Sequence, residues 1–272
     1  MKNEALQENA AFVTFNNEDQ GCLLDDSNHS KYPIRYYNVI NGIGLDAFNA
    51  DCSYYGFIYE GTTDLISVDR PAIKLEQGMY FSIVGPFLLN PTCQSKLVIV
   101  EVCHTKGIYP QNNYKAMFNV GGKIEEHGRL NYIDGCTDSL LIPPIKMGDP
   151  CFNHLHFPPA ISQTPHTHPS HRIGLVVKGN GLCVTPFGNL ILKEGMIFVI
   201  KQWDGKEYKK GQDGKDYEVG NHCFYTYENS MDVVAFHPDS DFGATDINHP
   251  MINRTIVDGI SANQIKDIQT KS

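Results

Sequence analysis

The chain has 272 residues, a formal net charge of -9 at pH 7 and a pI near 5.6. This length can bury a substantial core, as one large domain or as two of ordinary size. The acidic balance and the lack of a Lys/Arg stripe argue against nucleic acid as a partner. The N-terminal sequence lacks the pattern of a secretory signal, and no apolar run could span a membrane. The eight cysteines are scattered along the chain. These features together predict a cytoplasmic protein with reduced thiols and no membrane partner.

Short apolar segments rich in β-branched and aromatic residues recur along the chain, separated by Gly, Pro, Asn and Asp. The clearest of them are residues 96–103, 172–179, 195–200 and 232–237. This pattern predicts an all-β sandwich or barrel. Two segments, 3–12 near the N-terminus and 259–271 near the C-terminus, are expected to be helical.

An internal repeat runs through the chain. YGFIYEG (55–61) resembles IGLVVKG (173–179) at an offset of 118, and LEQGMYFSI (75–83) resembles LKEGMIFVI (192–200) at an offset of 117. Two matches in the same order and at nearly one offset predict a duplicated β unit.

A looser match further along the chain aligns His104 with His237. His104 lies in the first copy, so we expect a structural role for His237, and the same for His249. The second copy also carries an insertion over 201–220, which is expected to be either a lid or a solvated hairpin.

The segment HTHPSHRIGLVVKGNG (166–181) places three histidines within six residues. His166 and His168 share a face if they lie on a strand, because side chains alternate. A turn at Pro169 and Ser170 can bring His171 to the same side. Imidazole nitrogens are ligands for Fe, Zn, Cu, Ni and Mn. His222 offers a fourth nitrogen from the segment that follows the insertion, so we predict one metal site with these four histidines as ligands.

The strand after the third histidine predicts how the side chains point. His171, Ile173 and Leu175 share one face, and the two apolar residues favour the barrel interior for it. Arg172 is then expected to point outward. Shifted by 118 residues, the first copy offers Phe48, Ala50 and Ser53 in place of the histidines, so only the second copy is expected to bind metal.

Other polar and aromatic residues are candidates for the surroundings of the metal. His154 and His156 alternate onto one face, which is either inward, for substrate binding or acid–base chemistry, or outward, as ordinary surface or inter-sheet histidines. Cys223 follows a histidine ligand directly and is expected to point away from the metal. The remaining candidates for substrate contacts are Gln163, Phe224, Thr226 and Trp203.

The stretch PHTHPSHRIGLVVKGNG, followed by LKEGMIFVI and then NHCFYT, resembles the two motifs of the cupin superfamily, most closely over residues 150–240. Together with the repeat, the chain resembles a bicupin, with two tandem cupin-type jelly-roll (double-stranded β-helix) barrels. The resemblance implies four parts in chain order. They are an N-terminal arm (1–29), a degenerate barrel without metal ligands (30–128), a metal-binding barrel (129–245) and a C-terminal tail (246–272).

The resemblance assigns His166, His168 and His222 to the histidine ligands of the family. In many cupins with this spacing a glutamate stands where His171 is. His171 can therefore ligate the metal, stay off it, or act in proton transfer. A neutral imidazole in place of a carboxylate leaves more positive charge on the metal, which favours an anionic substrate or a metal-bound hydroxide.

The function implied by the resemblance is that of a metal-dependent enzyme acting on a small organic substrate, most similar to non-haem Fe(II) dioxygenases. A metal-dependent lyase or isomerase and a non-enzymatic small-molecule-binding cupin are the alternatives. His171 and His156 are the candidate catalytic residues. Fe(II) is the favoured cofactor, with Ni, Mn, Zn and Cu as other options, and a homodimer is one option for the oligomeric state.

Overall fold

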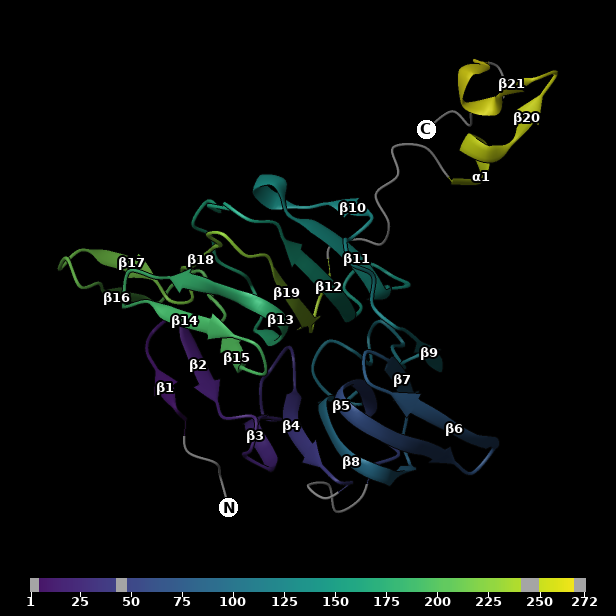
Figure 1. Cartoon of the computed structure of the whole chain (residues 1–272), viewed down its shortest axis with the longest axis horizontal. Helices are drawn as coiled ribbons and strands as arrows, with labels where there is room; N and C mark the ends of the chain where they lie inside the picture. The colour runs from purple at the N-terminus through teal and green to yellow at the C-terminus, as the bar shows by residue number, and fades with distance from the viewer. Residues whose placement is uncertain (1–4, 43–47, 241–249, 267–272) are drawn as a thin grey trace.

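The computed structural model describes residues 5–42, 48–240 and 250–266, and two antiparallel sheets dominate it (Figure 1). The first sheet contains β3 (Gly21–Asp26), β4 (Ile34–Ile40), β5 (Ser53–Ser67), β6 (Arg70–Glu76), β7 (Tyr80–Val84), β8 (Phe87–Val102) and β9 (Asn119–Gly121). The second contains β1 (Gln7–Glu8), β2 (Phe12–Phe15), β10 (Leu130–Asn131), β11 (Thr137–Ile142), β12 (Cys151–Phe157), β13 (Arg172–Val184), β14 (Leu190–Lys193), β15 (Ile197–Ile200), β18 (Cys223–Tyr225) and β19 (Met231–His237). The smaller elements are β16 (Tyr208–Lys210), β17 (Asp216–Glu218), β20 (Ile256–Val257), β21 (Ile260–Ser261), α1 (Pro250–Arg254) and the 3-10 turns Ile133–Gly135 and Ala262–Gln264.

The prediction of an all-β chain is confirmed, whereas the two predicted helices are wrong. Within the first predicted helix, residues 3–4 lie outside the described residues, and the rest contains β1 and the start of β2, whose residues Phe12–Phe15 are all buried and pair with β15. Near the C-terminus, β21 and a single 3-10 turn occupy the described part of the second predicted helix, and residues 267–271 lie outside the described residues, as does His249. Within the described chain, no helix has the length and apolar character needed to cross a membrane.

The internal repeat is visible in the order of the strands. In the first sheet, neighbouring strands follow the order β3-β4-β8-β5-β7, and in the second the order is β11-β12-β19-β13-β15. The repeated segments 55–61 and 173–179 lie in β5 and β13, which occupy the same place in the two orders. The two halves of the chain are therefore copies of one jelly-roll unit.

Each copy also lends a strand to the other sheet. β2 precedes the first copy in the chain but pairs with β15 at the edge of the second sheet. Likewise β9, which precedes the second copy, pairs with β7 at the edge of the first sheet. This exchange covers one edge of each sheet, and it ties the two barrels together through backbone hydrogen bonds.

A glycine–phenylalanine pair recurs at the centre of both barrels. Gly56 on β5 lies opposite Phe81 on β7, and Gly174 on β13 lies opposite Phe198 on β15. A Cβ atom at Gly174 would come within 2.4 Å of the Phe198 ring, and one at Gly56 within 2.2 Å of the Phe81 ring. The repeated sequence keeps glycine here because the phenylalanine ring occupies the space of a side chain.

We expect Gly174→Ala to destabilise the protein by about 1–3 kcal/mol, because the added methyl group overpacks a filled core. Phe198→Leu in the same chain should recover part of this loss, since it removes the ring that the methyl group meets. Urea unfolding of the two single variants and the double variant measures the coupling. Additive effects of the two substitutions would contradict the contact.

Three buried clusters fill the molecule. One lies inside the first barrel, around Phe81 and Leu97, and one inside the second, around Val176 and Phe198. The third joins the two sheets, and it contains Tyr36 and Val100 from the first sheet together with Leu175, Phe236 and others from the second. The central strands are therefore buried on both faces, so their apolar character does not reveal which face points into the barrel.

In the first barrel, aromatic side chains pack around the position that corresponds to the first histidine. Phe48, which corresponds to His166, stacks on Phe87 with 3.5 Å between ring centroids and meets Tyr54 edge-on. The Tyr54 hydroxyl donates a hydrogen bond of 2.9 Å to Glu101 Oε2. These contacts fill the first barrel with packed side chains, which suits a supporting role.

Candidate metal centre and its pocket

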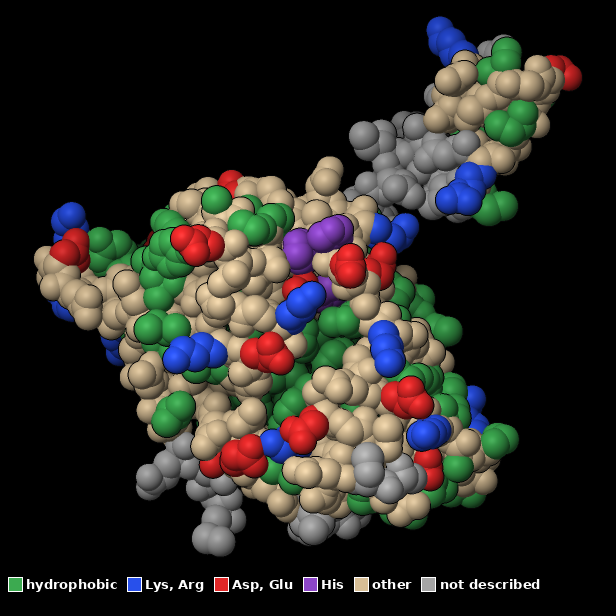
Figure 2. Space-filling model, viewed as in Figure 1, with side chains coloured by type: hydrophobic (Ala, Val, Ile, Leu, Met, Phe, Trp, Pro, Cys, Tyr) green, Lys and Arg blue, Asp and Glu red, His purple; other side chains and the backbone are tan. Residues whose placement is uncertain are grey.

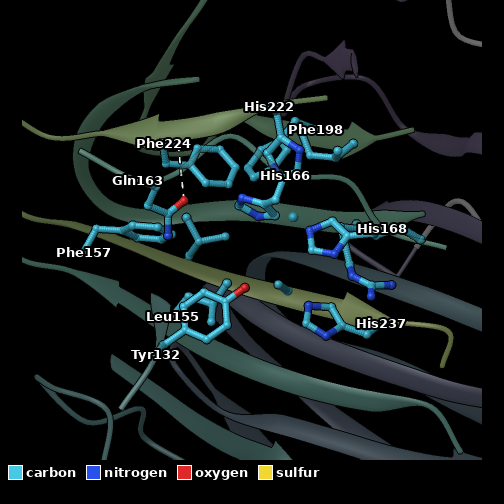
Figure 3. Close-up of a pocket in the computed structure, with 16 residues that line it drawn as sticks. Tyr132, Leu155, Phe157, Gln163, His166, His168, Phe198, His222, Phe224 and His237 are labelled. Carbon is cyan, nitrogen blue, oxygen red and sulfur yellow. Dashed lines mark hydrogen bonds between the residues drawn. The ribbon is translucent and has the colours of Figure 1, made fainter. Parts of the chain in front are cut away.

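Three histidines converge at one end of the second barrel. A ring nitrogen from each of His166, His168 and His222 lies within 4.8 Å of the other two. The ring centroids are 4.5 Å apart for His166 and His222, and 5.0 Å apart for His166 and His168. Among the described residues, no other set of three His, Cys, Asp or Glu side chains gathers in this way. Figure 3 shows the three rings around a shared space.

Backbone hydrogen bonds hold these histidines in place. His166 and His222 form an antiparallel bridge, with N–H···O distances of 2.9 and 3.0 Å in the two directions. Gln163 extends the same pairing, since its N–H donates to Phe224 O at 3.0 Å. The carbonyl oxygen of His168 accepts a hydrogen bond of 2.8 Å from the Trp203 N–H. The ligand atoms are thus positioned by the sheet and by the start of the insertion.

Hydrogen bonds at the back of two rings determine which nitrogen can bind a metal. His166 Nδ1 lies 2.8 Å from Thr164 O, and His222 Nδ1 lies 2.8 Å from Gly220 O. A carbonyl oxygen only accepts, so each Nδ1 carries the proton and each Nε2 keeps its lone pair. This is the arrangement that orients metal-binding histidines. The residues present therefore fit a divalent transition metal.

Two of the three histidines, His168 and His222, are held in their neutral form. Burial, followed by the charge of Arg172, lowers the pKa of His168 far below its ordinary value. Burial and the neighbouring His166 lower the pKa of His222 to about 3. Neutral imidazole is the form that binds metal, so these two ligands need no deprotonation at neutral pH.

These depressed pKa values predict that the metal-free protein loses stability on acidification. Below pH ~6.5 the unfolded chain protonates a histidine that the folded chain keeps neutral. The free energy of unfolding should then fall by about 1.4 kcal/mol per pH unit for each such histidine, until the folded-state pKa is reached. Urea unfolding between pH 7.5 and 5 measures the slope, and His222→Gln should reduce it. A stability that rises on acidification would contradict the assignment.

The three histidines line a narrow pocket with a cavity volume of about 30 Å³. Much of the wall is apolar, and the lining includes Leu155, Phe157, Phe198, Phe224 and Val233. The other polar lining residues are Tyr132, Gln163, Arg172 and His237. Among the described residues that line the pocket, none is an Asp or Glu. The pocket therefore offers hydrogen-bond donors to a small molecule, and the positive charge of Arg172 is shared with Asp239, which lies outside the lining.

His171 does not join the other three histidines, which differs from the sequence-based expectation. Its Nδ1 accepts a hydrogen bond of 3.1 Å from the Gln202 N–H, and its Nε2 lies 3.4 Å from Asp26 Oδ2 on β3. His171 therefore lies at the junction of the two sheets and lines a different surface hollow. The geometry gives it neither a ligand role nor a catalytic one.

Arg172 is also on the other side from the one expected, because the alternation along β13 is shifted by one residue. Ile173 and Leu175 pack into the cluster between the sheets, whereas Gly174 and Val176 face the barrel interior. Arg172 shares the inward face and lines the pocket. Its Nη1 donates a hydrogen bond of 3.0 Å to Asp239 Oδ1, and its buried Nε has no partner among the described residues.

Two pocket residues were missed by the sequence analysis. His237 was expected to be structural, on the basis of its alignment with His104. The strand pairing shows instead that Ala235 corresponds to Ile99, because both lie opposite the repeated glycine. His237 thus corresponds to Glu101, and it lines the pocket below His168 (Figure 3). Tyr132, just before the 3-10 turn Ile133–Gly135, contributes a phenol, and burial raises its pKa.

The remaining candidates divide between the pocket and other places. Gln163 and Phe224 line the pocket. Thr226 does not; its hydroxyl donates to Pro158 O and accepts from the Ile161 N–H. Trp203 reaches the site only through its backbone contact with His168, while its side chain packs against Tyr208.

The insertion and the second histidine pair lie away from the pocket. β16 and β17 pair as a hairpin, and β16 is fully exposed; whether the hairpin closes over a ligand stays a prediction. His154 and His156 point to the face opposite the pocket, because Leu155 between them lines it. The structure therefore shows the outward alternative in its inter-sheet form, because both side chains are buried. The Cys223 thiol donates to Val184 O, away from the histidines.

The barrel topology and the histidine cluster define this molecule as a tandem cupin fold. No protein-family model matches the sequence, and no curated protein sequence matches it. Protein Ylba from E. coli is 14% identical over 88% of this chain and 96% of that one, with a TM-score of 0.58. A cupin 2 conserved barrel domain protein from Leptotrichia buccalis is 12% identical over 87% and 91%, with a TM-score of 0.52. A salicylate 1,2-dioxygenase from Pseudaminobacter salicylatoxidans is 12% identical over 75% and 70%, with a TM-score of 0.51. At these identities the likeness concerns the fold.

Proposed function

We propose that this protein is a metal-dependent cupin enzyme that binds one divalent transition metal through His166, His168 and His222 and acts on a small anionic organic molecule. The observation that carries the metal site is the set of three imidazoles, two of them with Nε2 left free by a backbone carbonyl at Nδ1. Three protein ligands leave further coordination positions for substrate, as in catalytic metal sites generally.

The substrate class follows from the charges in the pocket. Arg172 lies among the lining residues, whereas burial lowers the pKa of His237 well below its ordinary value and keeps that imidazole neutral. The Arg172 guanidinium pairs with Asp239, but its buried Nε has no partner among the described residues, and no described Asp or Glu lines the pocket. A guanidinium recognises a carboxylate through paired hydrogen bonds, and a divalent metal adds positive charge. The apolar wall and the small cavity suit a compact hydrocarbon body. We therefore infer that the substrate is a small carboxylate.

We further propose that the reaction is an Fe(II)-dependent dioxygenation. A divalent iron with open positions supplies dioxygen activation and substrate chelation at one centre. The protein would contribute the neutral ligand set, the positive charge of Arg172 to orient the substrate, and an apolar wall that excludes bulk water. One structural neighbour is named as a salicylate 1,2-dioxygenase, which agrees with this choice but concerns that protein. Under this proposal, the metal-dependent lyase or isomerase remains the second candidate.

The test is oxygen consumption by the full-length protein after anaerobic loading with Fe(II). The substrates are a panel of small aliphatic and aromatic carboxylates, including salicylate, and the matching amides serve as neutral controls. A dioxygenase consumes about one O₂ per substrate lost, and only with the carboxylates. Substrate loss without O₂ uptake would replace the dioxygenase with the lyase or isomerase. Metal binding with no turnover of any carboxylate would leave only a binding protein.

A further inference from the structure

A second histidine cluster lies on the opposite face of the second sheet from the pocket. Its members are His154 and His156 on β12, Asp232 on β19 and His127 in the segment before β10. His156 and Asp232 are directly opposite each other in the pairing of these strands. The cluster adjoins a groove between the two barrels that is lined by Lys123, Glu125, Glu126, Lys178 and Asp232 among others. None of the chemistry proposed above uses it.

Asp232 organises the two buried rings. Its Oδ1 lies 2.8 Å from His156 Nδ1 and 3.0 Å from His154 Nε2. An ionised carboxylate only accepts hydrogen bonds, so His156 Nδ1 carries a proton. In neutral His156, Nε2 then keeps its lone pair, as in a carboxylate–histidine–metal arrangement.

The lone pair of His156 faces a second imidazole. His156 Nε2 lies 3.3 Å from His127 Nδ1. Two nitrogens bound at ~2.0–2.1 Å to one tetrahedral ion are about 3.3–3.4 Å apart. The pair thus already has the separation that a shared metal ion requires.

The chain carrying His127 is anchored against the sheet. The Gly128 N–H donates a hydrogen bond of 2.9 Å to Thr137 Oγ1, and Thr137 lies opposite His156 on β11. A Cβ atom at Gly128 would come within 2.4 Å of the Asp138 backbone, so only glycine permits this close approach. The position of His127 next to His156 is therefore built into the fold, although the His127 side chain itself is exposed.

Acidic side chains complete the surroundings. Glu125 accepts a hydrogen bond of 2.9 Å from Ser139 Oγ, and Ser139 lies opposite His154 in the pairing of β11 and β12. Glu125, Glu126 and Asp232 together give the groove three carboxylates. Figure 2 shows histidine and acidic side chains side by side on one face of the molecule. The groove is open to water, which can fill the remaining coordination positions.

We propose that His127 and His156 bind a second divalent transition metal ion of the Zn²⁺ type at the junction of the two barrels, with Asp232 orienting His156 behind it. Two imidazoles and nearby carboxylates suit Zn²⁺, Ni²⁺ or Cu²⁺ better than Mg²⁺ or Ca²⁺. Because its ligands come from β12 and from the segment that leads out of β9, the ion would also join the two halves of the chain.

The test is calorimetric titration with Zn²⁺ of the full-length His166→Ala/His222→Ala variant, in which the first site is removed. We expect about one Zn²⁺ per chain. Adding His127→Ala should weaken binding at least about 100-fold, because it removes a ligand that lies outside the core. Adding Asp232→Asn keeps an oxygen acceptor but removes the charge, and should weaken binding about 10–100-fold. Adding His171→Ala, which removes a histidine elsewhere at the junction, should change nothing.

Absence of zinc binding by the starting variant, with its fold verified by circular dichroism, would overturn the proposal and reduce the pair to a hydrogen-bonded contact. The same affinity before and after His127→Ala would overturn it as well. If the starting variant does not fold, the wild-type chain gives the answer, since His127→Ala should then lower the zinc content by one ion per chain. Neither result depends on whether the first site is catalytic.

Discussion

Replacing His166 or His222 by alanine is expected to lower the affinity of the protein for Zn²⁺ or Fe²⁺ at the first site by more than about 100-fold. Loss of a group behind a ligand already costs about 10–100-fold, so loss of a ligand itself should cost more. His222 is buried and His166 is bridged to it by two backbone hydrogen bonds, so the backbone should remain in place without the imidazole. Equilibrium dialysis against a competing chelator, followed by elemental analysis, measures the affinity.

His171→Ala is the matched control, because it removes a histidine from the same short segment. The side chain of His171 contacts Gln202 and Asp26 and is not part of the histidine cluster. Metal affinity at the first site should therefore stay within about threefold of the wild-type value, well below the 10–100-fold cost of losing a ligand-supporting group. A large loss of metal in His171→Ala, or none in His222→Ala, would show that the metal is held by a different set of residues.

Replacing Arg172 by glutamine is expected to weaken binding of small carboxylates by roughly 10–150-fold, which corresponds to the ~1.5–3 kcal/mol typical of a hydrogen bond to a charged group. Binding of the neutral amide analogues should hardly change, because they gain little from the guanidinium charge. Isothermal titration of the metal-loaded protein with each pair of ligands measures the difference.

Asp239 complicates this substitution, since it is largely buried and pairs with Arg172 at 3.0 Å. Loss of the arginine alone would leave an unpaired carboxylate near the site and cost stability. The double variant Arg172→Gln/Asp239→Asn removes both charges, so it is the better protein for comparing ligands. Equal weakening of the carboxylates and their amides would mean that Arg172 shapes the pocket and does not recognise charge.

Much of the fold could be predicted because the duplicated unit repeats its special residues. Gly56 and Gly174 recur since a phenylalanine ring fills their side-chain space. Gly61 and Gly179 recur since both have a positive φ, 72° and 75°, and lie against the carbonyl of a neighbouring strand. The exchanged strands β2 and β9 could not be predicted, because nothing local in a short apolar segment says which sheet edge it will join.

The three histidines of the first site could be identified from the sequence. Hydrophobicity alone, however, did not show which residues of the following strand face the barrel interior. Ile173 and Leu175 are apolar because they pack between the sheets, whereas the inward face needs room for Phe198 and carries Gly174. The glycine of the repeat was the available signal, since it places Arg172 inward by alternation. His237 was not predicted to line the pocket, because it was aligned with His104 by residue type. The register of the strands aligns it with Glu101 instead.

Anomalous diffraction from crystals soaked in Zn²⁺, recorded at the zinc edge, tests the central claim most directly. We expect a strong peak within bonding distance, about 2.0–2.1 Å, of nitrogens from His166, His168 and His222. His171 should not contact this peak. An absence of any peak among these three histidines in crystals containing excess zinc would contradict the metal centre, and with it the proposed enzyme.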